Sequence, residues 1–387
     1  MKTTVANSPK TVIFVAGGTS GHIHPALAIA GEIRDRHPDI RIIFCGLKGN
    51  IEEEMVPAAG YKFVPISARG IPTKYTPWFY RWIKDNISGT FTARRLIKDV
   101  KPVLVVGTGG YVSGPVIMAA AQYKIPFVLH EQNVYPGRAN RLFAKRAAEV
   151  FVTNEDSKKN FPGKAKITVT GNPVQPVFYT LDKEAGRHAI GIAEDRFLVV
   201  VTGGSLGAQR LNKTISDLRE NPGWHSLVEQ HPELMLMLST GKERESSPEV
   251  FEGISNVQVT SYLYNMAQWM SASDLVVSRS GAMTCAELVA LAKPSILIPY
   301  PQAMDDHQTK NAQSLSAIGG SIMVKDEDFN SDYLVEKVSH FINKPEELQA
   351  MSEALASTDR LPAAQLIYQK IAPYLSEKDN GDNEQIK

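Results

Sequence analysis

The sequence predicts an α/β protein of two domains, each built on a parallel sheet with helical crossovers. One motif occurs once in each half of the chain: an apolar run, a glycine-rich turn and a helix-like segment. The first copy joins residues 12–16 to the turn 17–21, and the second joins residues 197–201 to the turn 203–207. A continuous β-branched run is typical of a buried parallel strand, and glycines after it let a phosphate approach a helix N-terminus. The chain of 387 residues also exceeds the roughly 250–300 residues at which one core stops growing.

The first half of the chain alternates strand-like and helix-like segments, which is the pattern of a parallel sheet with crossovers. Residues 167–170 then lead into the turn Gly171-Asn-Pro-Val174, which continues neither a strand nor a helix. We therefore expect the N-terminal domain to comprise residues 1–174. Its strand candidates are residues 12–16, 42–45, 103–107, 126–129 and 150–153, with helix-like segments at residues 25–36 and 114–122.

The second half repeats this alternation, and we expect a C-terminal domain over residues 175–359. Ligands of such folds lie at the carboxyl ends of the strands, so we expect the two sheets to face one another across a ligand-binding cleft. A helix-like segment at about 360–375 is expected to pack back onto the first domain, and the charged residues 376–387 are predicted to be disordered. The strand candidates are residues 197–202, 234–239, 257–260, 275–278, 295–299 and 321–324.

Composition and charge exclude several classes of protein. The chain is 43% hydrophobic and 21% charged, as in soluble globular proteins, and its net charge of +1 argues against a broad nucleic-acid-binding surface. Its cysteines, Cys45 and Cys285, lie one in each half, which excludes a disulfide framework and a cysteine-based zinc site. Residues 1–10 are polar, and no apolar run reaches the roughly 18 residues that span a bilayer. We expect a cytoplasmic protein.

The glycine-rich turns do not fit the dinucleotide fingerprint, which needs Gly-x-Gly-x-x-Gly and an acid after the second strand. The turn Gly17-Gly-Thr-Ser-Gly-His22 has the wrong spacing, and no acid follows Cys45-Gly46 until Glu52. The turn Gly107-Thr-Gly-Gly-Tyr-Val112 has valine in place of the third glycine, and no turn ends in Gly-Lys-Ser/Thr. The sequence therefore indicates a phosphate-bearing ligand that is neither a dinucleotide nor a triphosphate held by a Walker motif.

Seven short motifs, weak one by one, are specific when they occur in this order and spacing over nearly the whole chain. They are Gly17-Gly-Thr-Ser-Gly-His-Ile-His-Pro25, Gly109-Gly-Tyr-Val-Ser-Gly-Pro115, His130-Glu-Gln-Asn133, Gly171-Asn-Pro-Val174, Gly203-Gly-Ser-Leu-Gly-Ala208, Ser278-Arg-Ser-Gly-Ala-Met-Thr284 with Glu287, and Asp306-His-Gln308 with Asn311-Ala312. Through them the chain resembles the MurG family of GT-B glycosyltransferases.

The resemblance implies the GT-B fold, with two Rossmann-like domains, and an inverting, metal-independent transfer without a cofactor. The transferred sugar is GlcNAc from UDP-GlcNAc. The implied acceptor is lipid I, undecaprenyl-pyrophosphoryl-MurNAc-pentapeptide, and the product is the β-1,4-linked lipid II of peptidoglycan synthesis. The resemblance also implies a peripheral location at the cytoplasmic face of the cell membrane. The expected partners are the anionic inner leaflet and cell-wall and division complex proteins, and no nucleic acid is expected.

The residues also support donor binding on physical grounds, because the charge of a departing diphosphate can be neutralised by a helix N-terminus. Residues 280–284 begin a helix after a buried strand, and Asp305-Asp306 lies in a proline-bounded loop rather than in a metal-binding Asp-x-Asp motif. Glu287, one turn further on, is placed to accept hydrogen bonds from both ribose hydroxyls; its alternative role is to complement the helix dipole. The resemblance assigns UDP-GlcNAc contacts to Thr19, Ser20, Gly21, Asn133, Ser205, Leu263, Ala282, Met283, Thr284 and Gln308.

An inverting transfer needs a base for the proton of the attacking hydroxyl, and histidine titrates in the right range. His22 follows the first glycine turn and is the favoured base in the family. Glu131 is the alternative base, and a purely structural role for His22 in orienting the loop stays open. We expect His24 to serve packing. The acceptor contacts implied by the resemblance are Tyr111, Ser113 and His130.

Two positions depart from the family pattern. Gln175 stands where many members carry an arginine that reaches the donor diphosphate, which puts that contact in doubt. Arg210, two residues after Ala208 in the second glycine motif, is a possible source of the missing cation.

Residues 74–84 interleave aromatic rings with lysine and arginine, a mixture that suits a membrane interface. We expect Trp78, Phe79 and Trp82 to contact the membrane. The alternative is an amphipathic helix whose aromatic side is buried in the domain core.

Two other functional classes stay open beside the lipid I transferase. One is a different enzyme on the same fold, such as a UDP-GlcNAc 2-epimerase or a glycolipid synthase; residues 130–133 and the Tyr111 turn argue against it. The other is a catalytically silent UDP-sugar-binding or membrane-recruitment subunit, which His22 and Glu287 make less attractive.

Overall fold

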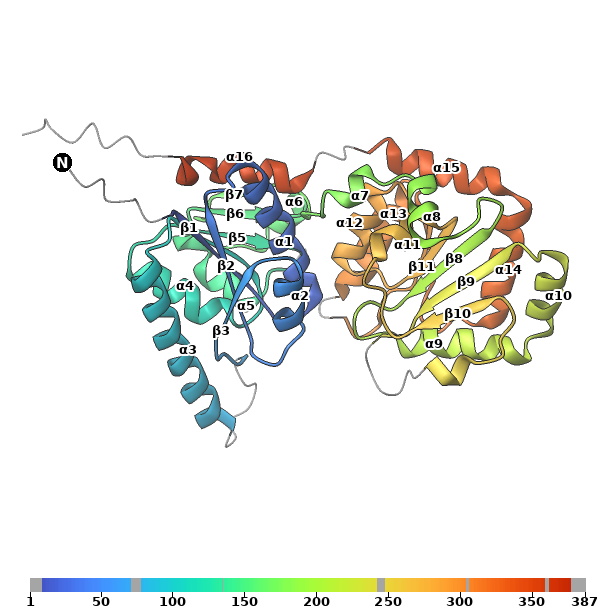
Figure 1. Ribbon diagram of the computed structural model, residues 1–387, viewed down its shortest axis with the longest axis horizontal. Coiled ribbons are helices and arrows are strands. Elements are labelled where there is room, and N and C mark those ends of the chain that lie inside the picture. Colours follow the sequence, from blue (N-terminus) through green and yellow to red (C-terminus); the bar gives the residue numbers. More distant parts are fainter. Residues whose placement is uncertain are drawn as a thin grey trace, which may run out of the picture. The chain divides into compact units, whose positions relative to one another are not determined.

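The protein is described by a computed structural model, which covers residues 9–70, 78–133, 135–241, 248–303, 306–358 and 362–376. Disorder is predicted for residues 376–387, and of these, residues 377–387 lie outside the described part of the chain. The chain divides into two compact units, Met1–Gln175 with Leu361–Lys387 and Pro176–Arg360. The division after Gln175 falls next to the expected domain boundary. Figure 1 shows the elements of each unit.

Unit 1 contains a seven-stranded sheet in the order β3-β2-β1-β4-β5-β6-β7. Every strand pair in it is parallel. The order reverses between β1 and β4, so the loops after these two strands meet at one edge of the sheet. The strands are β1 Thr11–Ala16, β2 Arg41–Gly46, β3 Lys62–Pro65, β4 Leu104–Gly109, β5 Phe127–Glu131, β6 Glu149–Val152 and β7 Ile167–Val169.

Helices of unit 1 cover both faces of this sheet, and an apolar core lies on each face. The C-terminal helix α16 returns to unit 1, where Ile367, Ile371 and Leu375 join the core beside α1. The ring nitrogen His37 Nε2 and the hydroxyl of Tyr368 on α16 are 2.8 Å apart. The helices are α1 Ser20–Arg36, α2 Glu52–Ala58, α3 Trp78–Val100, α4 Ser113–Gln122, α5 Arg138–Phe143, η1 Ala144–Arg146, α6 Glu155–Lys158 and α16 Ala363–Leu375.

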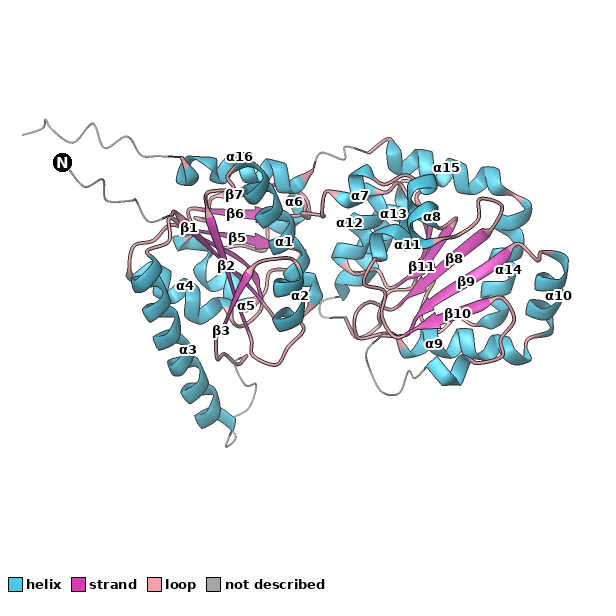
Figure 2. Ribbon diagram, in the orientation of Figure 1, coloured by secondary structure: helices cyan, strands magenta, loops and turns pink. Residues whose placement is uncertain are grey.

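Unit 2 contains a six-stranded parallel sheet in the order β10-β9-β8-β11-β12-β13. Figure 2 shows its strands side by side between helices. The order reverses between β8 and β11, which repeats the plan of unit 1. The strands are β8 Phe197–Thr202, β9 Leu234–Ser239, β10 Val257–Thr260, β11 Leu275–Ser278, β12 Ser295–Leu297 and β13 Ser321–Met323.

The helices of unit 2 enclose a large core on one face of its sheet and a smaller one on the other. They are α7 Val177–Thr180, α8 Lys183–Ile190, α9 Gln209–Ser216, η2 Asp217–Glu220, α10 Pro222–Gln230, η4 Pro248–Phe251, α11 Met266–Ala272, α12 Ala282–Ala290, α13 His307–Ala317, α14 Ser331–Asn343 and α15 Pro345–Ala356. The predicted class, two α/β units with parallel sheets, is confirmed.

Candidate active site

The predicted base, His22, lies in the first turn of α1, where the glycine-rich loops after β1 and β4 meet. A Cβ atom on Gly109 would lie 2.5 Å from the Nδ1 atom of His22, and one on Gly110 would lie 2.1 Å from the Gly17 carbonyl oxygen. Both residues also have positive φ angles, of 119° and 82°, which L-residues with side chains rarely adopt. The Thr108 hydroxyl donates to the His22 carbonyl at 2.6 Å. Glycine at these positions therefore lets the two loops close around the His22 ring.

The buried carboxylate of Glu52 accepts hydrogen bonds from the first glycine turn and from the end of β2. The Oε1 atom of Glu52 accepts hydrogen bonds from the N–H of Gly18 at 3.2 Å and of Leu47 at 2.9 Å. Its Oε2 atom is buried and has no hydrogen-bond partner within the described ranges. This acid, which the sequence pattern excluded as a ribose ligand, thus binds a backbone donor of the turn. The chain itself fills a position that a phosphate oxygen takes in many glycine-rich turns.

Replacing Glu52 with alanine is expected to destabilise unit 1 by about 2–4 kcal/mol, because the buried N–H of Leu47 and the partly buried N–H of Gly18 lose their acceptor. Urea unfolding measures the loss, and hydrogen exchange at Gly18 and Leu47 localises it. The matched control is Glu53→Ala, which removes an exposed carboxylate whose Oε2 accepts from Gly49 N–H at 2.6 Å; water can replace this contact. Equal losses in both variants would contradict the role of Glu52.

His22 is connected to the end of β5 by a hydrogen-bonded glutamine. The distance from His22 Nδ1 to Gln132 Oε1 is 3.1 Å, and Gln132 Nε2 lies 2.7 Å from the Thr108 carbonyl and 3.0 Å from His130 Nδ1. His130 is 0% exposed, its Nε2 atom lies 3.2 Å from the Gly171 carbonyl oxygen, and burial lowers its pKa to about 4. The structure thus places His130 inside unit 1, with both ring nitrogens engaged. It departs from the predicted acceptor contact.

Glu131, the alternative base, is 2% exposed, and both of its carboxylate oxygens accept hydrogen bonds. The donors are the Asn133 N–H at 3.0 Å, the Asn133 amide at 3.2 Å, the Gly137 N–H at 2.9 Å and the Asn140 amide at 2.9 Å. A carboxylate so fully engaged is poorly suited to accept a substrate proton. Its place in the fold is to fix the loop that carries Asn133.

The other two residues predicted to contact the acceptor substrate, Tyr111 and Ser113, differ in their exposure. Tyr111 is half exposed beside the glycine turns, so its ring is available to a ligand. Ser113 is fully buried, and its hydroxyl donates to the Gly109 carbonyl at 2.9 Å, so it stabilises the turn instead. The predicted donor contacts of unit 1 other than Asn133 lie at the start of α1: Thr19, Ser20 and Gly21.

Gln175, which stands where many family members carry an arginine, contacts α1. Gln175 Nε2 lies 3.2 Å from the Nδ1 atom of His24. Desolvation lowers the pKa of His24 to about 4, so this ring is neutral and its Nδ1 atom accepts the hydrogen bond. This pair serves packing, in line with the expectation for His24.

In unit 2, the helix predicted to face the diphosphate is α12, which follows β11. Its N-cap is Gly281, which has extended backbone angles and no side chain to cap the first N–H groups. The first helical residues are Ala282, Met283 and Thr284, as expected from the sequence. A helix N-terminus that follows a glycine is suited to an anion.

Hydrogen bonds with α13 hold Ser280, the residue before the N-cap of α12, in place. The Ser280 hydroxyl donates to the Gln308 carbonyl at 2.8 Å, and the Asn311 amide donates to the Ser280 carbonyl at 3.0 Å. The side chain of Gln308, predicted to contact GlcNAc, accepts from the Tyr300 N–H at 2.9 Å through Oε1. The serine-glycine turn and the predicted sugar contact are therefore parts of one hydrogen-bonded unit.

Glu287 lies one turn into α12, is 9% exposed, and has its pKa raised to about 8 by burial. No hydrogen bond within the described part of the chain compensates the buried carboxyl group. A helix-dipole role does not require such burial, because an exposed acid would serve it equally well. The geometry therefore favours a carboxyl group that awaits hydrogen-bond donors from a ligand.

Arg210 is engaged by another residue of unit 2. Its Nε atom lies 3.6 Å from the Asp326 carboxylate, which also binds Arg279 at 2.5 Å. Arg279 Nη1 further donates to the Ile298 and Pro299 carbonyls at 3.2 and 3.3 Å. The two arginines thus share one acid beside the α12 approach, and Arg210 is not an independent cation in this structure.

Two more predicted donor contacts come from loops of unit 2. Ser205 lies half-buried in the turn after β8, where Gly204 and Gly207 have positive φ angles of 86° and 87°. Leu263 follows β10 and is buried in the smaller core of unit 2. Leu263 therefore offers a ligand little more than the edge of its side chain.

The predicted membrane segment begins α3. Phe79 and Trp82 are partly buried and stack on one another, with ring centroids 5.5 Å apart. Residues 74–77 and the Trp78 side chain lie outside the described part of the chain. Among the described side chains of α3, the large apolar ones that are exposed are Tyr80, Ile87 and Phe91, at 79%, 52% and 67%. Lys84, Arg94, Arg95 and Lys98 are also exposed on this helix.

None of the described helices is long and apolar enough to cross a membrane. The described residues also contain no cluster of three or more histidines, cysteines or acids that could hold a metal ion. Of the pair Asp305-Asp306, the first residue lies outside the described ranges, and the second precedes α13.

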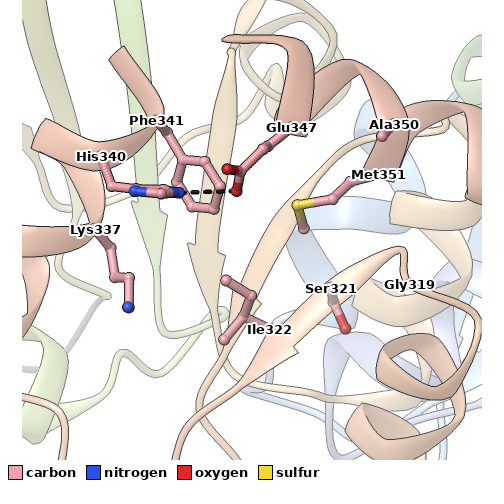
Figure 3. A pocket seen from close by; sticks show the side chains of 9 residues that line it. All are labelled: Gly319, Ser321, Ile322, Lys337, His340, Phe341, Glu347, Ala350 and Met351. Atoms are coloured by element: carbon pink, nitrogen blue, oxygen red, sulfur yellow. Dashed lines mark hydrogen bonds and ion pairs between the residues drawn. The ribbon is translucent and has the colours of Figure 1, made fainter. Parts of the chain in front are cut away.

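One pocket of about 440 Å³ lies at the edge of unit 2 (Figure 3). β13, α14 and α15 line it, and His340 Nε2 and Glu347 Oε2 lie 2.8 Å apart at its side. No residue predicted from the sequence to bind substrate lines this pocket. The lining residues are Gly319, Ser321, Ile322, Lys337, His340, Phe341, Glu347, Ala350 and Met351.

Comparisons with known proteins cover both units. The glycosyltransferase family 28 N-terminal domain matches residues 12–152, and the C-terminal domain of the same family matches residues 198–367. A UDP-N-acetylglucosamine–N-acetylmuramyl-(pentapeptide) pyrophosphoryl-undecaprenol N-acetylglucosamine transferase of Acetivibrio thermocellus is 35% identical over 382 residues, 96% of this chain and 100% of the relative.

Solved structures support the same assignment. MurG of Acinetobacter baumannii aligns with a TM-score of 0.68 and 25% identity, over 94% of this chain and 100% of that one. The UDP-GlcNAc 2-epimerase of Neisseria meningitidis, solved with UDP-GlcNAc, aligns with a TM-score of 0.62 at 17% identity, over 94% of this chain and 100% of that one; it shares the fold alone. These structural likenesses confirm the predicted GT-B fold.

The relatives at this identity span nearly the whole chain, and both domain matches belong to one family. The resemblance read from the seven motifs is therefore confirmed. The chain belongs to glycosyltransferase family 28, within the MurG family of UDP-N-acetylglucosamine–N-acetylmuramyl-(pentapeptide) pyrophosphoryl-undecaprenol N-acetylglucosamine transferases.

Proposed function

We propose that this protein transfers GlcNAc from UDP-GlcNAc to lipid I and so forms the lipid II of peptidoglycan synthesis. The observation that carries the proposal is the 35% identity to a transferase of that name over 100% of the relative's length. Two features that suit the reaction support it: a histidine held between glycine turns, and a helix N-terminus that follows a glycine and has a buried acid one turn away.

The chemistry follows from these parts. The acceptor hydroxyl oxygen attacks C1 of GlcNAc from the face opposite the diphosphate, and the bond between C1 and the UDP oxygen breaks. The hydroxyl proton passes to His22 Nε2, and UDP leaves with the electron pair of the broken bond. Attack from the opposite face inverts the anomeric configuration and gives the β-1,4 linkage.

Unit 2 is the proposed donor-binding unit. The N–H groups at the start of α12 and the loop of Ser205 hold the diphosphate, and Glu287 accepts hydrogen bonds from the ribose hydroxyls. As the leaving group gains charge, the α12 N-terminus stabilises it without reorganisation. In this proposal no divalent metal and no cofactor takes part.

Acceptor-dependent release of UDP tests the function. We expect UDP release from UDP-GlcNAc to require a lipid I analogue, and the product to carry one additional GlcNAc. Conversion of UDP-GlcNAc to its C2 epimer without acceptor would favour the epimerase alternative. Donor binding without turnover under any acceptor condition would favour the silent subunit.

The exposed face of α3 is the proposed site of peripheral membrane docking at the cytoplasmic side. Its apolar side chains, Tyr80, Ile87 and Phe91, stand among lysines and arginines, which suits the headgroup level of an anionic leaflet. Cell-wall and division complex proteins remain further predicted partners.

The triple variant Tyr80→Ser, Ile87→Ser, Phe91→Ser is expected to lose most of its flotation with anionic liposomes, because the buried apolar area supplies much of the binding. The matched control replaces Leu206 and Tyr264 of unit 2, which are 63% and 81% exposed. It is expected to float like the unaltered protein. Equal flotation of the triple variant and the unaltered protein would refute docking through α3.

A further inference from the structure

A directed chain of hydrogen bonds runs from a backbone carbonyl to the ring of His22. It begins at Gly171, passes through the His130 ring and the Gln132 side chain, and ends at the Nδ1 atom of His22. A branch joins Gln132 to the Thr108 carbonyl. Gln132 and His130 are 4% and 0% exposed, so solvent does not compete for these contacts.

The two carbonyls fix the orientation of every group between them, because a carbonyl oxygen only accepts. The atom of Gln132 that faces the Thr108 carbonyl at 2.7 Å must be the amide nitrogen. Its second hydrogen then points to His130 Nδ1 at 3.0 Å, and Oε1 is the atom left to face His22. The amide orientation is thus set by chemistry.

The His130 ring fits the same direction. Its Nε2 atom faces the Gly171 carbonyl at 3.2 Å and must carry a hydrogen. In a neutral ring Nδ1 then has the lone pair that Gln132 needs as its acceptor. Burial lowers the pKa of His130 to about 4, so the ring is neutral at physiological pH and this pattern is kept.

We propose that Gln132, oriented by His130 and Thr108, holds the proton of neutral His22 on Nδ1 and leaves Nε2 as the basic nitrogen. Gln132 Oε1 accepts only, so the facing ring atom, Nδ1, is the donor. This inference rests on the proposed function, in which His22 takes the acceptor proton. Gln132 and His130 are positioning residues, since neither touches the reacting atoms.

This chain of hydrogen bonds gives a function to the buried side chains of Gln132 and His130. A base is useful only in the tautomer whose lone pair faces the substrate, and the hydrogen bond at the other nitrogen selects that tautomer. When Nε2 takes the hydroxyl proton, the Nδ1–H bond to Gln132 stays in place. Because an amide oxygen is a very weak base, the proton remains on His22 and does not move along the chain.

Nitrogen NMR of histidine-labelled protein shows directly which ring nitrogen of His22 carries the hydrogen. The His22 signals are assigned by their loss in His22→Gln. We expect neutral His22 in the unaltered protein to show hydrogen on Nδ1. In Gln132→Met, which lacks the acceptor, we expect the share of this tautomer to fall.

Kinetics of the same proteins separate positioning from folding. Gln132→Met is expected to lower kcat about tenfold or more, within the ~10²–10⁴-fold that a base contributes, and to leave KM for UDP-GlcNAc unchanged. The control Thr153→Val removes hydrogen bonds to the Glu131 and Gln132 carbonyls and is expected to leave the His22 tautomer unchanged.

Hydrogen on Nε2 of neutral His22 in the unaltered protein, or an unchanged tautomer in Gln132→Met, would overturn the proposal. Failure of the proposed function gives a different result. In that case UDP release stays independent of acceptor while the Nδ1–H tautomer and its dependence on Gln132 are still observed.

Discussion

Replacement of His22 with alanine is expected to lower kcat by about 10²–10⁴-fold, the usual contribution of a general base. The Kd for UDP-GlcNAc is expected to stay the same, because the proposed donor contacts with phosphate and ribose belong to unit 2. The physical reason for the loss is that the acceptor hydroxyl then attacks without a group to take its proton. Steady-state kinetics with a lipid I analogue and calorimetric titration of the donor measure the two quantities.

The neighbouring histidine provides a matched control. His24→Asn removes an imidazole from the same helix, two residues away, whose Nδ1 atom is bonded within the chain to Gln175. We expect it to keep kcat within severalfold of the unaltered protein. Near-normal turnover of His22→Ala would refute His22 as the base, and Glu131 offers no simple replacement because both its oxygens are occupied.

Replacement of Glu287 with alanine is expected to weaken UDP-GlcNAc binding by about 10²–10⁴-fold. Two hydrogen bonds from ribose hydroxyls to a charged acceptor contribute about 1.5–3 kcal/mol each, and about 1.4 kcal/mol corresponds to tenfold. The matched variant Glu287→Gln keeps the shape and one acceptor oxygen, so we expect an intermediate loss. Calorimetry measures both; a Kd unchanged in both variants would show that the donor does not contact Glu287.

The same contact predicts a pH dependence of donor affinity. Burial raises the pKa of Glu287 to about 8, and the ionised carboxylate accepts hydrogen bonds from ribose hydroxyls more strongly than the neutral acid does. Donor affinity is therefore expected to rise with pH, by at most about tenfold per pH unit, and to level off above pH 8. The proton released on binding at pH 7 is measurable as a dependence of the calorimetric heat on the buffer, and this dependence should vanish in Glu287→Ala.

The raised pKa of Glu287 also determines how the unfolding free energy of the free protein depends on pH. Between pH 4.5 and 8 the unfolded chain has lost the Glu287 proton while the folded chain keeps it. The contribution of Glu287 to the unfolding free energy therefore falls as pH rises through this window and is constant above it.

The sheets could be predicted because their strands are continuous apolar runs. The strand β3, Lys62–Pro65, was missed because its apolar run is only Phe63 and Val64 and a proline follows at once, so its apolar signal is weak. The helix α1 was expected from residue 25 but begins at Ser20. Pro25 resembles a helix start, yet a proline near the first turn of a longer helix removes few hydrogen bonds.

The candidate site could be predicted in part. The places of His22 and Glu287 follow from their glycine turns and strands, which are local features. The inward direction of His130 and the engagement of Arg210 depend on partners far along the chain: Gly171 for His130 and Asp326 for Arg210. Period-two alternation in a buried strand does not distinguish a polar group that faces a ligand from one that faces a distant loop.

The most direct test of the central claim is acceptor-dependent UDP release measured in the presence of a chelator such as EDTA. The account holds that the N–H groups of α12, without a divalent ion, carry the charge of the departing diphosphate. It predicts equal rates of release, with GlcNAc on the lipid I analogue, in chelator and in buffer with Mg²⁺. A loss of turnover in chelator that Mg²⁺ restores would contradict it.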